Sequence, residues 1–265
     1  MKKISLSISI LLASTMAYSF DVNSIVNAAT QATTNSSSST QTGSSSSLSD
    51  SLVTSGLKEA LKIGVDFGVK ELSKENGYLS NAKIPLPENL AKAEGLIRKV
   101  GGDKIADDLI NSMNKAATTA APKTAAIFVD AVDKMTLDDA QKILAGDKNA
   151  ATDYFAKNTS TSLQKMISPI IKDSMKDNNV ASYYDTFNNY YQSNVKALTE
   201  NSQVMGYAKQ FGADKYLPTS DKNLDAYVTD KAIEGLFKMI GEKEASIRTD
   251  TLAQTTSLLK QVFSN

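Results

Sequence analysis

The sequence predicts an all-α protein, with a single bundle-like helical domain after a signal peptide and a Ser/Thr-rich tether. Three observations support this fold class. Apolar residues recur at helical spacing from about residue 52, no stretch alternates apolar and polar residues over five or more positions, and the chain contains only five prolines. The predicted parts are therefore a signal peptide at 1–19, a disordered low-complexity tether at 20–51 and an all-helical domain at 52–265. A domain of this length can bury one sizeable core.

The N-terminus has the three parts of a secretory signal peptide. Lys2 and Lys3 form the charged start, residues 4–13 form a short apolar centre, and Ala17-Tyr18-Ser19 supplies small residues for cleavage. We expect cleavage after Ser19 or Ala17. The apolar centre is too short for a membrane span, and no later segment is apolar over the length that a span requires. The mature chain is also predicted to carry no lipid anchor, because it lacks the N-terminal cysteine that lipidation uses.

The segment that follows is predicted to be a flexible tether. Residues 22–49 contain no charged side chain and consist mainly of Ser, Thr, Asn, Gln and Ala. Such a composition cannot bury enough apolar surface to offset the chain entropy that folding costs.

The first helix of the domain is predicted from its apolar face. Leu57, Leu61, Gly64, Gly68 and Leu72 fall on one side of a helix. The two glycines are four residues apart, a spacing that lets two helix backbones approach closely. We expect this close approach inside the domain, although the same spacing could serve a dimer.

Glycine and proline predict where the next helices begin and end. The Ile84–Pro87 segment breaks the chain, and Pro87 can start a helix that continues to about Val100. Gly101-Gly102 ends that helix, and Asp103 is expected to cap a third one.

The second half of the domain continues the helical pattern. Thr136 with Asp139 resembles a capping box for a short helix that Gly146 closes. Helix boundaries are also expected at the remaining prolines, Pro122, Pro169 and Pro218. Later helices are predicted at about 149–177, 179–198, 222–241 and 250–263.

The composition excludes several classes of chemistry. The chain has no His, no Cys and no Trp, so it can form no Ser-His-Asp triad, no thiolate nucleophile, no disulfide and no structural zinc site. No motif for a metal or a nucleotide cofactor occurs, and we predict no catalytic residue, no metal site and no cofactor. Carboxylates are the remaining route to an enzyme, with candidate pairs at Asp107-Asp108, Asp138-Asp139 and Glu242/Glu244.

The charge balance excludes a nucleic-acid partner. The chain carries 29 basic and 29 acidic residues, and loss of Lys2 and Lys3 with the signal peptide would leave 27 basic ones. The mature protein is therefore slightly acidic, whereas phosphate binding needs a concentrated basic face.

Aromatic residues cluster in one short segment. Tyr183, Tyr184, Phe187, Tyr190 and Tyr191 lie within an arc of about 120° on a helical wheel at about 100° per residue. Such a stripe could form the wall of a site for a sugar, a lipid or a partner helix, because the tyrosine ring packs while its hydroxyl makes hydrogen bonds. The alternative, which we favour, is that the stripe packs in the core or at its edge.

Arginine is rare, with only Arg98 and Arg248 in the whole chain. We expect these two residues where a planar guanidinium is needed, in a buried ion pair or in an anion contact. Arg248 is therefore a candidate binding residue. Its structural alternative, which we favour, is a salt bridge to Glu242, Glu244 or Asp225.

Several sequence blocks, taken in order, resemble one known family. These blocks are Gly56–Leu61, Ile84–Glu88, Ala150–Phe155, Leu224–Thr229, Gly235–Phe237 and Ile247-Arg248. Together they resemble the bacterial envelope family known as domain of unknown function 4197, over about residues 55–265. The resemblance implies a helical, secreted protein of Gram-negative bacteria, located in the periplasm. It implies no activity, substrate or catalytic residue.

The third of these blocks adds one candidate residue. Its Tyr154 and Phe155 place two aromatic rings beside Asp153 early in a helix. The candidate ligand-binding residues are therefore Tyr154, Tyr183, Tyr184, Phe187, Tyr191 and Arg248.

The preferred hypothesis is a periplasmic, non-enzymatic binding or interaction module of the cell envelope. Its partner would be an envelope protein or a small apolar or glycan ligand. Two alternatives remain open, a carboxylate-dependent hydrolase acting on an envelope glycan or ester, and a purely structural envelope protein.

Overall fold

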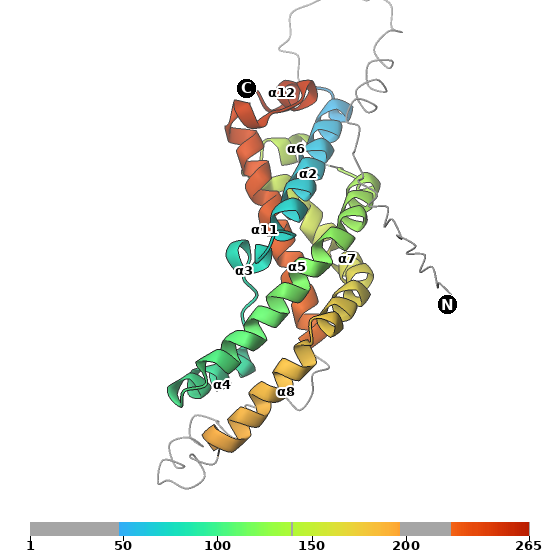
Figure 1. The fold of residues 1–265 in the computed structure, drawn as a ribbon. Coiled ribbons are helices and arrows are strands. Elements are labelled where there is room, and N and C mark those ends of the chain that lie inside the picture. Colours follow the sequence, from blue (N-terminus) through green and yellow to red (C-terminus); the bar gives the residue numbers. More distant parts are fainter. Residues whose placement is uncertain (1–47, 139, 197–223, 265) are drawn as a thin grey trace, which may run out of the picture. The chain divides into compact units, whose positions relative to one another are not determined.

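The computed structural model describes residues 48–138, 140–196 and 224–264 (Figure 1). These residues form a single all-α domain, and none of them belongs to a β-strand, which confirms the predicted fold class. The predicted signal peptide, residues 20–47 of the predicted tether, and Pro218 lie outside the described residues. None of the helices in the described ranges is long and apolar enough to cross a membrane.

Four long helices build the core of the domain. They are α2 (Asp50–Leu72), α5 (Asp103–Lys134), α7 (Ala150–Asp177) and α11 (Leu224–Thr249). The most extensive packing is between α2 and α11, at opposite ends of the described sequence, and α7 packs against both α5 and α11 (Figure 1). The apolar faces that the sequence pattern predicts therefore meet in one shared core.

Shorter helical elements connect the long ones and close the ends of the bundle. They are α3 (Gly77–Asn81), α4 (Glu88–Lys99), α6 (Ala140–Leu144), α8 (Val180–Tyr190), a π-helix (Tyr191–Lys196), a 3-10 turn (Thr251–Ala253) and α12 (Ser257–Phe263).

The two glycines of α2 allow that helix to approach α11 closely. A Cβ atom on Gly64 would lie 2.9 Å from Cγ2 of Ile240, and one on Gly68 would lie 2.9 Å from Cδ1 of Leu236. Side chains at these positions would push the two helices apart. The expectation of close packing inside the domain is thus confirmed.

Several helix boundaries differ from those predicted. At the C-terminal end, α11 continues to Thr249, past the predicted end at 241, and the predicted helix at 250–263 is a 3-10 turn followed by α12 from Ser257.

Two helix starts differ slightly. Ser49 caps α2, accepting a hydrogen bond from the Leu52 amide at 3.3 Å, so the helix begins at Asp50, two residues before the expected boundary. The predicted cap Asp103 is instead the first residue of α5, and Gly102 occupies the cap position. The carboxylate still lies in the first turn, where it complements the helix dipole.

Two of the proline predictions are wrong, because Pro122 lies inside α5 and Pro169 lies inside α7. A proline in a helix interior costs about 3 kcal/mol. Both helices continue because large buried residues lie on each side of the prolines, for example Met113 and Phe128 in α5, and Ile167 and Ile171 around Pro169. Burying each large apolar side chain contributes about 1.5–3 kcal/mol, so a few of them offset the cost.

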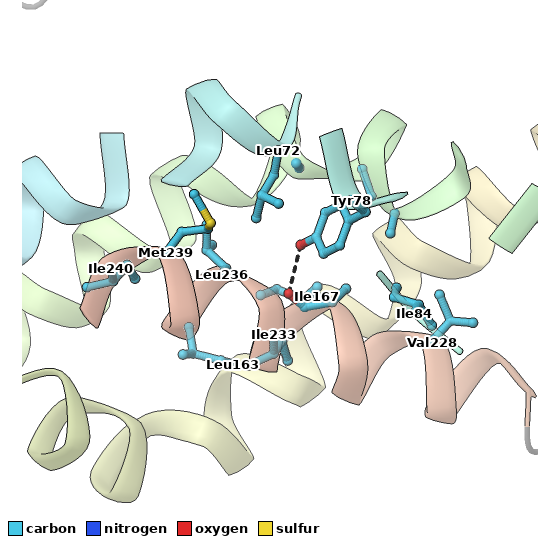
Figure 2. Close-up of a cluster of buried hydrophobic side chains, with 14 of the residues drawn as sticks. Leu72, Tyr78, Ile84, Leu163, Ile167, Val228, Ile233, Leu236, Met239 and Ile240 are labelled. Carbon is cyan, nitrogen blue, oxygen red and sulfur yellow. Dashed lines mark hydrogen bonds between the residues drawn. The ribbon is translucent and has the colours of Figure 1, made fainter. Parts of the chain in front are cut away.

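Tyr78 joins α3 to the centre of the core (Figure 2). A Cβ atom on Gly235 of α11 would lie only 2.8 Å from Cε1 of the Tyr78 ring, so the glycine leaves room for this ring. The Tyr78 hydroxyl donates a hydrogen bond to the Ala232 carbonyl of α11 at 2.7 Å. Burial raises the pKa of this phenol far above its usual value of 10. Tyr78 is therefore a neutral hydrogen-bond donor inside the bundle.

Candidate functional site

A groove of about 510 Å³ runs between the first turns of α7 and the second half of α11. Its size falls within the range of about 300–1,000 Å³ that is usual for small-molecule sites. The floor is apolar and is formed by Ala156 of α7 with Phe237, Gly241 and Ala245 of α11. Phe237 is held in place by edge-on contacts with two buried rings, Phe128 and Phe155.

Gly241 is part of the lining of this groove. It lies in the interior of a 26-residue helix, where glycine costs about 1 kcal/mol relative to alanine. A Cβ atom here would meet nothing closer than Cβ of Asn149 at 3.5 Å and Cγ2 of Thr152 at 3.7 Å, which are ordinary contacts. Internal packing therefore does not require glycine at position 241, in contrast to Gly64, Gly68 and Gly235.

The rim of the groove carries charges of both signs. Lys148 comes from the turn before α7, Asp153 from the first turn of α7, and Glu234, Lys238 and Glu242 from α11. A polar rim around a small apolar floor suits a ligand that has both polar and apolar groups.

A buried carboxylate fixes the end of the groove where α7 begins. Glu244 of α11 is fully buried, and its oxygens accept hydrogen bonds from the Ala151 amide at 3.0 Å and the Thr152 amide at 2.7 Å. The Thr152 hydroxyl also donates to Glu244, at 2.5 Å. The free N–H groups at the start of α7 are thus bound by the protein's own carboxylate and are not an anion site for a ligand.

Arg248 completes this arrangement. Its guanidinium donates to Glu244 at 2.8 Å, and to the Leu144 and Ile143 carbonyls at the end of α6 at 2.7 and 3.1 Å. Its other contact is the Phe263 ring of α12, at 5.4 Å from the ring centre. The structural alternative for Arg248, a salt bridge to Glu244, is confirmed.

Arg98 has a similar structural role in another place. It pairs with Glu94 on α4 and, across the Gly101-Gly102 turn, with Asp107 on α5 at 2.6 Å. The hydrogen bond from Arg98 lowers the pKa of the Asp107 carboxyl below its usual value.

The tyrosine stripe lies mainly in the core. Tyr184, Phe187 and Tyr191 are 7%, 1% and 5% exposed, which confirms core packing for these three rings. Tyr190 is half-buried and donates to the Val100 carbonyl at 2.9 Å, whereas Tyr183 is 39% exposed. The rings therefore do not form one continuous exposed wall.

The six predicted site residues do not come together in the structure. Tyr154 is half-buried and follows Asp153 of the groove, and Arg248 lies next to the groove, one turn beyond Glu244. Tyr183, Tyr184, Phe187 and Tyr191 belong to α8 and the π-helix that follows it, neither of which contributes to the groove. Ligand binding at these six side chains stays a prediction.

Sequence reasoning did not identify the groove. Its lining comes from two segments about ninety residues apart, and neither segment contains a binding motif. The sequence pattern placed Gly241 at the end of a helix predicted at 222–241, whereas in the structure it lies inside α11, which continues to Thr249. In the described part of the chain, no group of three or more acidic side chains is placed to hold a metal ion.

A comparison with known families gives one match. The family described as "Protein of unknown function (DUF4197)" matches residues 47–264, essentially all of the described domain. No curated protein and no solved structure matches the chain. Two sequence blocks that resemble the family, Ala150–Phe155 and Gly235–Phe237, both contribute residues to the groove.

Proposed function

The chain belongs to the DUF4197 family, and we propose that it is a periplasmic, non-enzymatic module of the cell envelope that binds a ligand in the α7–α11 groove. One observation carries this proposal. Gly241 weakens α11 although the packing of the bundle does not require it, and it lies in the lining of the groove. Residues that break a local structural rule without serving packing are expected at functional sites.

The sequence supports the periplasmic location. Lys2 and Lys3, the apolar residues that follow and the small residues around Ser19 have the pattern of a cleavable signal peptide. The slightly acidic charge of the mature chain argues against nucleic acid as the ligand.

The groove is a better candidate site than the tyrosine stripe. Three rings of the stripe are buried in the core, those of Tyr184, Phe187 and Tyr191. A ligand could contact these rings only if they left the core, and this movement would expose their apolar surface to water. The groove is open in the structure and needs no such rearrangement.

The groove is less suited to the alternative of a carboxylate-dependent hydrolase. Such an enzyme needs one carboxyl group that stays protonated, and proteins achieve this by burying it in apolar surroundings. The groove carboxylates Asp153 and Glu242 are exposed. Glu244 is buried, but its oxygens are engaged by Arg248, Thr152 and the Ala151 amide.

Native mass spectrometry of the protein purified from the periplasm tests the proposal. We expect a reproducible bound mass on the wild type and its loss in Gly241→Phe, because the ring would occupy the groove floor. Gly95→Phe is the matched control, since Gly95 lies on α4 with nothing within 4 Å of its Cβ position. The control should keep the bound mass.

Thermal denaturation of both variants separates loss of binding from loss of folding. Loss of the bound mass with a native melting temperature supports the groove as the site. Absence of any bound mass on the wild type, or its retention in Gly241→Phe, contradicts the proposal. An empty wild type would favour the purely structural alternative.

A further inference from the structure

The charges on the rim of the groove fall into two classes according to their partners. Glu234 is paired with Lys231 at 2.6 Å, and the Lys238 ammonium donates to the Asn81 carbonyl of α3, also at 2.6 Å. Both groups are therefore engaged by the protein itself. A ligand would therefore compete with a protein partner at both groups.

Three other rim charges have weak partners or none. Lys148 makes no hydrogen bond or ion pair with the described part of the chain. Among the described residues, only the side-chain amide of Asn149 donates to the two Asp153 oxygens, at 3.2 Å each. The nearest cation to Glu242 is the Lys238 ammonium at 3.7 Å, beyond hydrogen-bond distance.

These three charges are arranged as a cationic end and an acidic middle. Asp153 on α7 and Glu242 on α11 flank the open floor at Gly241. Lys148 lies in the turn just before α7, five residues before Asp153. The last four of these residues follow the helical path, since the Asp153 amide donates to the Asn149 carbonyl at 2.9 Å. Four residues rise about 6 Å along a helix and one further Cα–Cα step adds up to about 3.8 Å, so the backbones at Lys148 and Asp153 are roughly 6–10 Å apart. The backbone of two or three extended residues spans about 7–10 Å. A ligand of that length can reach the acidic middle with one end and the lysine with the other.

Lys148 is the cation available to an anionic ligand group at this end of the groove. The amides of Ala151 and Thr152 at the start of α7 already donate to Glu244, and Arg248 is engaged by Glu244 and the end of α6. The apolar floor beside the charges, Phe237 and Ala156, is suited to an apolar side chain between the two ligand ends.

We propose, on the basis of the binding function above, that the ligand is a short zwitterionic peptide of two or three residues. Its ammonium group lies between Asp153 and Glu242, its carboxylate is held by Lys148, and an apolar side chain packs on Phe237. This assignment uses each of the three weakly partnered charges.

Calorimetric titration of the purified wild type with the tripeptide Ala-Leu-Ala tests the proposal. The same peptide with an acetylated N-terminus, and with an amidated C-terminus, serves as the matched control for each charge. We expect the free peptide to bind and each derivative to bind at least tenfold more weakly.

Double-mutant cycles assign each end of the peptide to its residue. Lys148→Ala should weaken binding of the free peptide at least tenfold. It should not weaken binding of the amidated peptide, which has no carboxylate for Lys148 to hold. Glu242→Gln should likewise weaken binding of the free peptide at least tenfold. It should not weaken binding of the acetylated peptide, which has no ammonium group for Glu242 to contact. All these side chains are exposed, so melting temperatures should stay at the wild-type value.

Three results would overturn the ligand assignment: no binding of Ala-Leu-Ala, equal binding of the acetylated form, or binding that Gly241→Phe leaves unchanged. This failure is distinguishable from failure of the proposed function. If the wild type carries a bound mass that Gly241→Phe loses, but none of the peptides binds, the groove is a site for another ligand class.

Discussion

Glu244 and Arg248, one turn apart on α11, form a buried ion pair whose two members each cap a different helix. Glu244 binds the first amides of α7, and Arg248 binds the last carbonyls of α6. The pair therefore holds both ends of the α6–α7 connection against α11. Lys148 and Asn149 lie on that connection, so the ion pair also shapes one end of the groove.

The first prediction concerns the stability that this pair provides. Glu244→Ala should lower the free energy of unfolding by about 3–5 kcal/mol, because it leaves the Arg248 charge and two amides buried without their partner. Urea denaturation measures the change. Glu242→Ala is the control, since the exposed Glu242–Lys238 pair at 3.7 Å should contribute less than about 1 kcal/mol. Equal losses in the two variants would contradict the assigned role.

The second prediction concerns the contact between α2 and α12. A Cβ atom on Gly56 would lie 2.6 Å from Cγ2 of Val262, so Gly56→Ala should cost about 1–3 kcal/mol. Adding Val262→Ala removes the methyl groups that collide with the new Cβ, so the double variant should regain part of the lost stability. Thermal unfolding of the single and double variants measures this change. Strictly additive effects of the two substitutions would show that the helices do not touch at this point.

The third prediction separates core from surface in the tyrosine stripe. Tyr184→Ala should lower the free energy of unfolding by about 3–5 kcal/mol, since the ring is 7% exposed. Tyr183→Ala removes a ring of the same size that is 39% exposed, and it should cost less than about 1 kcal/mol. Denaturant unfolding measures both losses. A larger loss for Tyr183→Ala than for Tyr184→Ala would mean that α8 turns its Tyr183 side, and not its Tyr184 side, toward the core.

The fourth prediction is a pH dependence at Tyr78. Burial raises the pKa of its phenol, so the folded state keeps the proton while the unfolded chain releases it near pH 10. The stability from this group is thus fully present below pH 10 and declines above it, by up to about 1.4 kcal/mol per pH unit. Tyr78→Phe lacks this decline but loses the hydrogen bond to Ala232, worth about 0.5–1.5 kcal/mol.

Urea unfolding at pH 9 and pH 11 checks this expectation. At pH 9 the wild type should be more stable than Tyr78→Phe, and at pH 11 the difference should shrink or reverse. If the difference in stability between the wild type and Tyr78→Phe stays constant between the two pH values, Tyr78 ionises as readily in the folded state as in the unfolded chain, which would contradict the prediction.

The fifth prediction concerns the glycine in the groove floor. Gly241→Ala should raise the free energy of unfolding by about 0.5–1 kcal/mol, because the new methyl group meets only ordinary contacts and the helix gains propensity. Gly95→Ala on α4 should give a similar gain in thermal unfolding. A destabilised Gly241→Ala variant would mean that the glycine serves packing after all.

Helical periodicity was enough to predict most of the elements. The predicted segment 149–177 corresponds to α7, and the break at Ile84–Pro87 separates α3 from α4. The two prolines inside helices were mispredicted because the local rule considers only the lost hydrogen bond. The burial that outweighs this loss comes from packing against other helices, and the local sequence does not show it.

The groove could not be predicted for a related reason. An apolar face identifies the side of a helix that is buried, but it does not say which other helix covers it. The groove exists because residues 148–156 lie along residues 234–245, a pairing that Glu244 fixes through the amides of α7. In the sequence Glu244 is one acidic residue among 29, and nothing local distinguishes it from the exposed Glu242.

The pairing of α2 with α11 has a consequence for the order in which the domain folds. Of the two helices, α2 is made first, and they are separated by more than 150 residues. Until the ribosome has produced α11, α2 and α7 lack the helix that covers their apolar faces, so the bundle cannot close. The pairing of α2 with α11 therefore requires a loop of more than 150 residues to close, which makes it a late step in the folding of the domain.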